Sequence, residues 1–216
     1  MQKVSNIIND KKDKDSIRNV VFDVLNSKGF IPKTGKTRYG SEVIIKDILH
    51  NIESSDLEVL QKCLNGENEL KLNGSILSDI GFARTTTRKL RDFRPSGCGP
   101  WEVLLGICFN GFKAKRGGDI TIKGVTYEVK LSGSGYIDNK RLMSKDFLKT
   151  EENILKQYLN QKPNILLIDN FGNYIVINFS NYEHLLKNNI VQFVKKTSGS
   201  DTDFGNLSLK YNRTAV

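Results

Sequence analysis

The segment RPSGCGP, residues 94–100, most constrains how this 216-residue chain can fold. It places two prolines and two glycines within seven residues, a composition that interrupts both helices and strands. Before this segment the apolar residues mostly follow helical spacing, and after it they form the short runs and alternations of strands. We therefore predict a helical N-terminal domain over residues 1–95 and a second, mixed domain over residues 96–216.

Helical spacing in the N-terminal part predicts three helices, over residues 17–28, 41–52 and 56–64. Gly29 and Gly66 follow the first and the third, where a glycine commonly ends a helix. A basic loop that contains glycine precedes the second helix. This part of the chain is therefore expected to be built from short amphipathic helices.

Two short helices that meet at Gly81 are expected within residues 70–90. The second is rich in threonine and arginine, and the pair loosely resembles a helix-turn-helix. Thr87 stands where that motif usually has an apolar β-branched residue. The alternative is that the basic side chains cover an ordinary solvated helix.

After residue 100 the pattern changes to strands between helices. The expected elements are an apolar helix over 101–109, strands over 119–122 and 125–131, an amphipathic helix over 144–159, strands over 164–169 and 174–179, a short helix over 182–187, a strand over 191–194 and a last edge strand over 207–211. This order predicts an α/β (α+β) fold, in which helices flank a mixed β-sheet core.

The net charge of +9, from 33 Lys and Arg against 24 Asp and Glu, favours a polyanionic partner, with DNA first. A hydrophobic fraction of 38% excludes a disordered chain and a membrane protein. The N-terminus lacks the apolar core of a signal peptide, so we expect no membrane association and a cytoplasmic location. Three widely spaced cysteines without a CxxC pair argue against a zinc site and against a disulfide framework.

Three acidic residues and one lysine form the chemically informative pattern. Glu102 lies on the apolar helix, Asp119 opens a strand, and Glu128 and Lys130 flank Val129 on the next strand. Because side chains alternate along a strand, Glu128 and Lys130 point to the same face. A tight turn joins the two strands, so Asp119 and Glu128 are expected near opposite ends of one hairpin. A register or twist that brings them together would put two carboxylates and an ammonium within one small site.

Two carboxylates and the Val129 carbonyl would make the hard, all-oxygen site that Mg²⁺ prefers. A metal held there polarises a phosphate and lowers the pKa of an attacking water. Lys130 would orient that water or stabilise the charge that builds on the phosphate. The opposing interpretations are an exposed strand that carries a Glu–Lys pair, and a Glu102 that only favours the positive end of its helix.

GGD at residues 117–119, followed nine positions after the aspartate by EVK at 128–130, resembles the PD-(D/E)xK signature of restriction endonucleases, Holliday-junction resolvases and phage exonucleases. Gly118 replaces the usual proline. GPWEVLLG resembles the helix that often carries a further acidic ligand, and KLSGSGY resembles the glycine-rich turn of phage-encoded members. The resemblance covers about residues 98–180, whereas residues 1–93 resemble no family.

The resemblance implies a restriction-endonuclease-like fold in which Asp119 and Glu128 are Mg²⁺ ligands and Lys130 is the catalytic lysine. Glu102 would complete or orient the metal shell, and Mn²⁺ is the expected substitute. Gln157 on a later helix is a further candidate by the same resemblance. A phage or mobile-element source is also implied, with the host cytoplasm as location.

We therefore expect a Mg²⁺-dependent deoxyribonuclease, an endonuclease before an exonuclease, whose N-terminal part selects a double-stranded DNA target. A homodimer suits site-specific cutting of both strands, whereas a junction or flap nuclease would recognise shape. The alternative function is a non-catalytic DNA-binding protein, regulatory or structural, on the same fold. The candidate DNA-binding side chains are basic and occur in both parts of the chain: Arg84, Arg88, Lys89, Arg91, Arg94, Lys113, Lys115, Arg116, Lys140 and Arg141.

Overall fold

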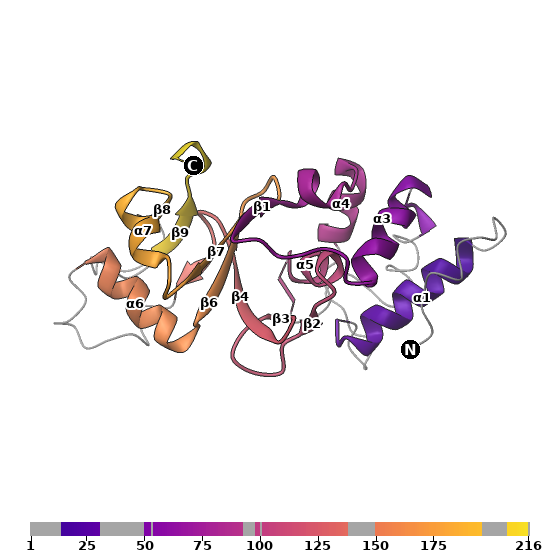
Figure 1. The fold of residues 1–216 in the computed structure, drawn as a ribbon, viewed down its shortest axis with the longest axis horizontal. Helices are drawn as coiled ribbons and strands as arrows, with labels where there is room; N and C mark the ends of the chain where they lie inside the picture. Colours follow the sequence, from indigo (N-terminus) through magenta and orange to yellow (C-terminus); the bar gives the residue numbers. More distant parts are fainter. Residues whose placement is uncertain are drawn as a thin grey trace.

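The fold is that of a mixed α+β protein, in which helices flank an open and mostly antiparallel sheet (Figure 1). A computed structural model describes residues 14–30, 50–52, 54–92, 98–99, 101–137, 150–195 and 207–215. The expected mixed sheet core flanked by helices is confirmed at this level. Within those ranges no helix has both the length and the apolar character needed to cross a membrane.

The first helices end where the sequence predicts. Helix α1 spans Lys14–Ser27 and α3 spans Ser54–Leu64. Gly29 and Gly66 follow them with φ of 78° and 77°, a backbone region that suits glycine. The helix predicted over 41–52 and the basic loop before it fall almost entirely outside the described residues.

Gly81 joins two short helices, as predicted. The π-helix η2 spans Ile76–Ile80, and α4 spans Arg84–Asp92. The carboxylate of Asp56, on α3, accepts hydrogen bonds from the Ala83 N–H and from the Thr86 hydroxyl, and so caps the start of α4. Strand β1, Asn73–Ser75, comes directly before η2 and was not predicted, because three residues carry too little pattern.

The main sheet has six strands in the order β1-β7-β6-β4-β3-β2, and only β4 and β6 pair in parallel. The predicted strands of this sheet are confirmed, although β3 begins one residue after Asp119. Lys123 and Gly124 turn from β3 to β4 with φ of 47° and 83°. The strands after β1 are β2 Phe112–Lys113, β3 Ile120–Ile122, β4 Val125–Leu131, β6 Asn164–Ile168 and β7 Asn173–Asn178.

A second sheet has the order β5-β9-β8 and corrects one prediction. Strand β9, Leu207–Tyr211, lies in the middle of this sheet, between β5 (Tyr136–Ile137) and β8 (Val191–Lys195), and is not an edge strand. The sequence missed this because β5 has only two residues. The loop predicted over 197–206 lies outside the described residues.

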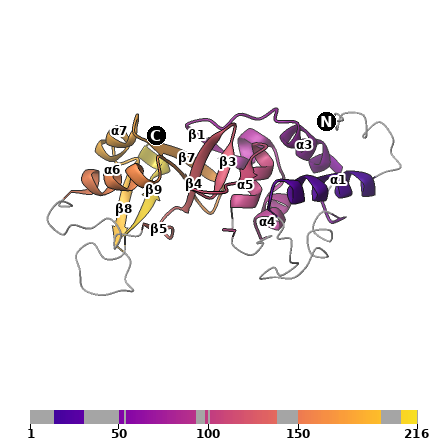
Figure 2. The same ribbon diagram turned by 90° about the horizontal axis from the view of Figure 1, so that it is seen from below.

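Helix α6 spans Glu151–Gln161, and the extended Thr150 before it shows that the predicted helix over 144–159 is not continuous. Residues 144–149 lie outside the described residues. Thr150 has an extended backbone, and its hydroxyl accepts the Asn153 N–H at 3.2 Å, which fixes the first turn. The short helix α7, Tyr182–Lys187, is confirmed. Both helices lie with the second sheet at one end of the molecule, as Figures 1 and 2 show.

Helix α5, Glu102–Cys108, is wholly buried between the main sheet and the N-terminal helices (Figures 1 and 2). One hydrophobic core combines residues from before and after residue 95, from Phe22 to Tyr174. Gly106 lets helix α5 pack closely against Phe30, because a Cβ at position 106 would lie 2.2 Å from the Phe30 ring. A second core, under α6 and α7, occupies the opposite face of β6.

Candidate active site

Asp119 lies opposite Glu128 at the open end of the β3–β4 hairpin. The register pairs Ile120 with Tyr127, which places the preceding residue, Asp119, level with Glu128. Asp119 Oδ2 accepts the Val129 N–H at 2.8 Å, and the Asp119 N–H donates to the Tyr127 carbonyl at 2.8 Å. The Asp119 side chain therefore provides the next hydrogen-bond acceptor for β4 at the point where the backbone of β3 stops pairing with it.

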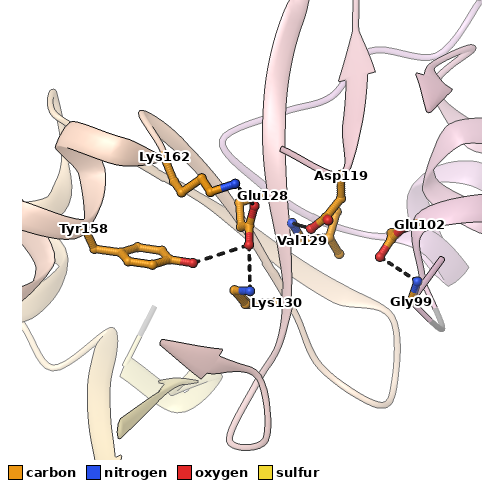
Figure 3. A network of polar contacts seen from close by, with 8 residues as sticks. All are labelled: Gly99, Glu102, Asp119, Glu128, Val129, Lys130, Tyr158 and Lys162. Atoms are coloured by element: carbon orange, nitrogen blue, oxygen red, sulfur yellow. Dashed lines mark hydrogen bonds and ion pairs between the residues drawn. The ribbon is translucent and has the colours of Figure 1, made fainter. Parts of the chain in front are cut away.

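Glu128 and Lys130 point to the same side of β4, as the alternation along the strand predicts (Figure 3). Lys130 Nζ donates to Glu128 Oε1 at 2.7 Å, and Lys162 Nζ lies 2.8 Å from Glu128 Oε2. The Tyr158 hydroxyl donates to Oε1 at 3.4 Å. Burial acts to raise the pKa of Glu128, but the hydrogen bonds from the two lysines outweigh it, and the pKa lies below its usual value.

Sequence reasoning missed Lys162 and Tyr158, which come from the C-terminal end of α6. It chose Gln157, which is exposed, whereas Tyr158 is buried and faces Glu128 (Figure 3). Lys162 follows Tyr158 by four residues, the spacing that places two side chains on one face of a helix. The amphipathic pattern places Tyr158 on the buried face of the helix, but it does not identify Glu128 as the partner of either side chain.

Glu102 occupies the first turn of α5 and is only 8% exposed. Its Oε1 accepts the Gly99 N–H at 2.5 Å. Burial, and after it the negative charge of Asp119, raise the pKa of Glu102 to about 7. The structure thus brings Glu102 within electrostatic reach of Asp119.

The pKa of Asp119 is also raised. Burial is the main cause, the charge of Glu128 adds to it, and the Val129 N–H and Lys130 act in the opposite direction. In the view of Figure 3 the β4 ribbon runs between Glu128 on one side and Asp119 with Glu102 on the other. Among the residues that the structure describes, no three acidic, histidine or cysteine side chains stand close enough together to enclose a metal ion.

The structure shows why a glycine stands at position 118. A Cβ at this position would lie 2.7 Å from the Tyr127 carbonyl oxygen and 2.8 Å from Thr126 Cγ2. Glycine therefore lets the chain approach β4 closely enough for Asp119 to reach Val129. Gly117, with φ of 81°, supplies the turn before it.

The candidate DNA-binding side chains form two groups. On α4, Lys89 Nζ donates to the Asn51 carbonyl at 2.8 Å, and Arg91 lies over the buried Trp101 ring at 5.7 Å. The α4 residues Arg84, Arg88 and Arg91 border one hollow, and Lys113, Lys115 and Arg116 border another. Arg94, Lys140 and Arg141 lie outside the described residues.

Comparison of this chain with protein-family models, with curated proteins and with solved structures gives no match. Its function is therefore inferred from the geometry of the carboxylate and lysine cluster, and from the short motif that carries the resemblance. The residues with the most informative chemistry are Glu102, Asp119, Glu128, Lys130 and Lys162.

Proposed function

We propose that the protein is a Mg²⁺-dependent DNA endonuclease of the PD-(D/E)xK type, on a restriction-endonuclease-like fold. The observation that carries the proposal is the bond from the Val129 N–H to Asp119 Oδ2, at 2.8 Å. Through this bond the aspartate of the motif adjoins the Glu128–Val129–Lys130 segment, although nine positions separate Asp119 from Glu128. The hairpin register thus supports the proposal, because it sets the two halves of the motif side by side.

The donor chemistry fits a hard divalent cation. Asp119 and Glu128 would hold Mg²⁺, with the Val129 carbonyl, and Glu102 would complete the shell. Burial, and after it the charge of a neighbouring carboxylate, raise the pKa of both Asp119 and Glu102, and a cation would offset both effects. Bound Mg²⁺ would supply Lewis-acid activation of the phosphate and of an attacking water.

The chain's own groups have distinct roles in this proposal. Lys130 orients the attacking water and stabilises negative charge on the phosphate. Lys162 holds the second oxygen of Glu128 and so fixes the carboxylate plane. Glu102, with a pKa of about 7, can hold or release a proton near neutral pH.

The DNA partner is supported by charge, since the chain carries a net +9. Basic residues of α4 and of the segment around β2 would contact backbone phosphates. In this proposal the N-terminal part, residues 1–95, selects a double-stranded target, and a homodimer would cut both strands. Mn²⁺ would substitute for Mg²⁺.

The test is cleavage of supercoiled and linear duplex DNA with Mg²⁺, with Mn²⁺ or with EDTA. We expect metal-dependent nicking that Lys130→Ala abolishes. The matched control is Lys123→Ala, which removes an exposed lysine from the turn of the same hairpin, where it pairs with Glu69 at 3.0 Å. Equal activity of the Lys130→Ala variant and the unmodified protein would reject the proposal.

The second candidate function is a non-catalytic DNA-binding protein. One observation favours it: Lys130 and Lys162 already engage both oxygens of Glu128, so a metal ion would have to compete with two ammonium groups. Titration with Mg²⁺, followed by calorimetry, separates the two functions. Metal uptake that Asp119→Asn removes would count against the non-catalytic function, and DNA binding without metal uptake would support it.

A further inference from the structure

A hollow of about 410 Å³ lies beside α4, away from the carboxylates. It is bordered by α4, by the turn between β6 and β7, and by the short 3₁₀-helix η4, Arg213–Ala215. Its volume falls within the range of sites that take a small ligand. The lining residues used below are Arg84, Thr87, Arg88, Arg91, Phe171 and Arg213.

One face of α4 supplies most of the positive charge. Residues 84, 87, 88 and 91 follow the spacing that places side chains on a single helix face. Arg213 adds a fourth guanidinium from the C-terminal end of the chain. The lining contains no carboxylate among the described residues, and guanidinium groups in this arrangement suit a phosphate.

Thr87 lines the hollow from the same face of α4, but its hydroxyl does not open into it. Its side chain is only 6% exposed, and its Oγ1 is covered by protein and has no hydrogen-bond partner. Buried hydroxyl groups are nearly always paired, because an unpaired one loses its bond to water without replacement. Removing this hydroxyl should therefore leave unchanged the surface that the hollow presents to a ligand.

Phe171 provides an aromatic surface at the rim. It lies in the turn after β6 and is 75% exposed, the largest exposure among the described bulky apolar side chains. Exposed aromatic rings next to arginines are typical of proteins that stack the bases of single strands. A base in duplex DNA is stacked on its neighbours and does not offer its face to such a ring.

We propose that this hollow binds one unpaired nucleotide of a DNA strand. The arginines of α4 and Arg213 hold the phosphate, and the base stacks on Phe171. Arg91, over the Trp101 ring, is already oriented by that contact.

The start of α5 connects the hollow with the carboxylate cluster. Trp101 borders the hollow, and Glu102, the next residue, belongs to the cluster. Leu166 pairs with Val129, and Phe171 lies in the turn that follows the strand of Leu166. This link alone rests on the proposed nuclease function, and it implies cutting near a junction between paired and unpaired DNA.

The test measures binding in EDTA, so that cleavage does not interfere. Fluorescence anisotropy would follow a labelled 12-nucleotide single strand and a duplex of the same sequence. We expect Phe171→Ala to weaken single-strand binding about tenfold and duplex binding much less. The matched control is Phe179→Ala, which removes another exposed phenylalanine, one that contacts Tyr182.

Thr87→Val removes the covered hydroxyl, keeps the shape of the side chain and serves as a second control. We expect unchanged single-strand binding with a Tm that is unchanged or higher, because the unpaired hydroxyl is gone. Single-strand binding that is unchanged in the Phe171→Ala variant would overturn the proposal, as would an equal loss on single strand and duplex.

The experiments can reject the nucleotide site and the nuclease function independently of each other. Metal-independent binding of the single strand, lost on Phe171→Ala, supports the nucleotide site whether or not the protein cleaves DNA. Cleavage that depends on Lys130, together with single-strand binding that is insensitive to Phe171, overturns the nucleotide site and retains the nuclease.

Discussion

Lys162 Nζ lies 2.8 Å from Glu128 Oε2, so the end of helix α6 reaches the strand that carries the glutamate of the motif. Lys130 holds the other oxygen of the same carboxylate at 2.7 Å. Glu128 is 9% exposed, and an ionised carboxylate at that depth requires such partners. The resting site is therefore neutralised by two lysines, which a divalent ion would have to displace or rearrange.

Lys162→Met should raise the pKa of Glu128, because an adjacent positive charge and its hydrogen bond are removed. The lowered pKa of Glu128 in the folded protein contributes stability above its ordinary value of 4.5, and that stability is lost as the pH falls below it. The variant should therefore lose less unfolding free energy than the unmodified protein when the pH is lowered through this range. Carbon NMR of the glutamate carboxylates and unfolding at pH 3 to 7 would measure both effects.

The matched control is Lys156→Met, which removes an exposed lysine from the same helix. It should leave the pKa of Glu128 unchanged. Equal titration of Glu128 in the two variants would show that Lys162 is not its partner in solution.

Glu102→Gln should stabilise the protein at pH 8 and leave its stability at pH 4 nearly unchanged. The folded-state pKa of about 7 exceeds the ordinary 4.5, so the folded protein binds more protons than the unfolded chain between these values. Stability therefore falls as the pH rises through this window, by on the order of 3 kcal/mol. Thermal unfolding at the two pH values measures the difference.

An exposed glutamate on α3 supplies the control for this prediction. Glu58→Gln should shift Tm little at either pH. A stabilisation by Glu102→Gln that is as large at pH 4 as at pH 8 would contradict ionisation as its cause. In the proposed nuclease, cleavage by the unmodified protein should rise as the pH passes about 7.

Asp119→Asn and Asp119→Ala should separate the structural role of this side chain from its charge. The asparagine oxygen can still accept the Val129 N–H, so the fold should be retained, whereas alanine leaves that N–H unpaired and costs about 1–3 kcal/mol. Cleavage should fall by about 100-fold or more in both, since even groups behind metal ligands contribute about 10–100-fold. Denaturant unfolding and a nicking assay would give the two readouts. Retained cleavage in the asparagine variant would exclude Asp119 as a ligand.

Gly118→Ala should displace Asp119 from β4, because the new Cβ would meet the Tyr127 carbonyl oxygen at 2.7 Å. We expect a loss of about 1–3 kcal/mol in unfolding free energy together with weaker cleavage. Gly124→Ala is the control, since its Cβ meets nothing within 4 Å and only the positive φ is strained. It should cost about 1 kcal/mol and leave cleavage unchanged. Equal effects of the two substitutions on cleavage would contradict the close approach at Gly118.

Long, strongly patterned elements could be read from the sequence. Apolar and polar residues alternate clearly over residues 125–131, and Lys123-Gly124 marks a tight turn. These two signals together predict the pairing of β3 with β4. Strands β1, β2 and β5 have two or three residues each, and their pairing depends on partners that are distant along the chain. No local pattern specifies such contacts.

The carboxylates of the site could also be predicted, because each lies on an element whose type was predicted. Lys162 and Tyr158 could not be connected to Glu128 without knowing that β4 and β6 pair in parallel. That pairing sets the end of α6, which directly precedes β6, beside the motif. The crossover between two parallel strands is long, and the sequence does not state which strands it joins.

The pairing of Asn73 with Ile175 has a consequence for the protein during its synthesis. One edge of the main sheet cannot form until nearly all of the chain has left the ribosome, although the motif is already complete at Lys130. At about 5–20 residues per second, translation from residue 130 to residue 175 takes on the order of 2–9 s. During that interval the nascent chain carries the motif without the strands that hold it, and the proposed cutting activity would begin only in the finished protein.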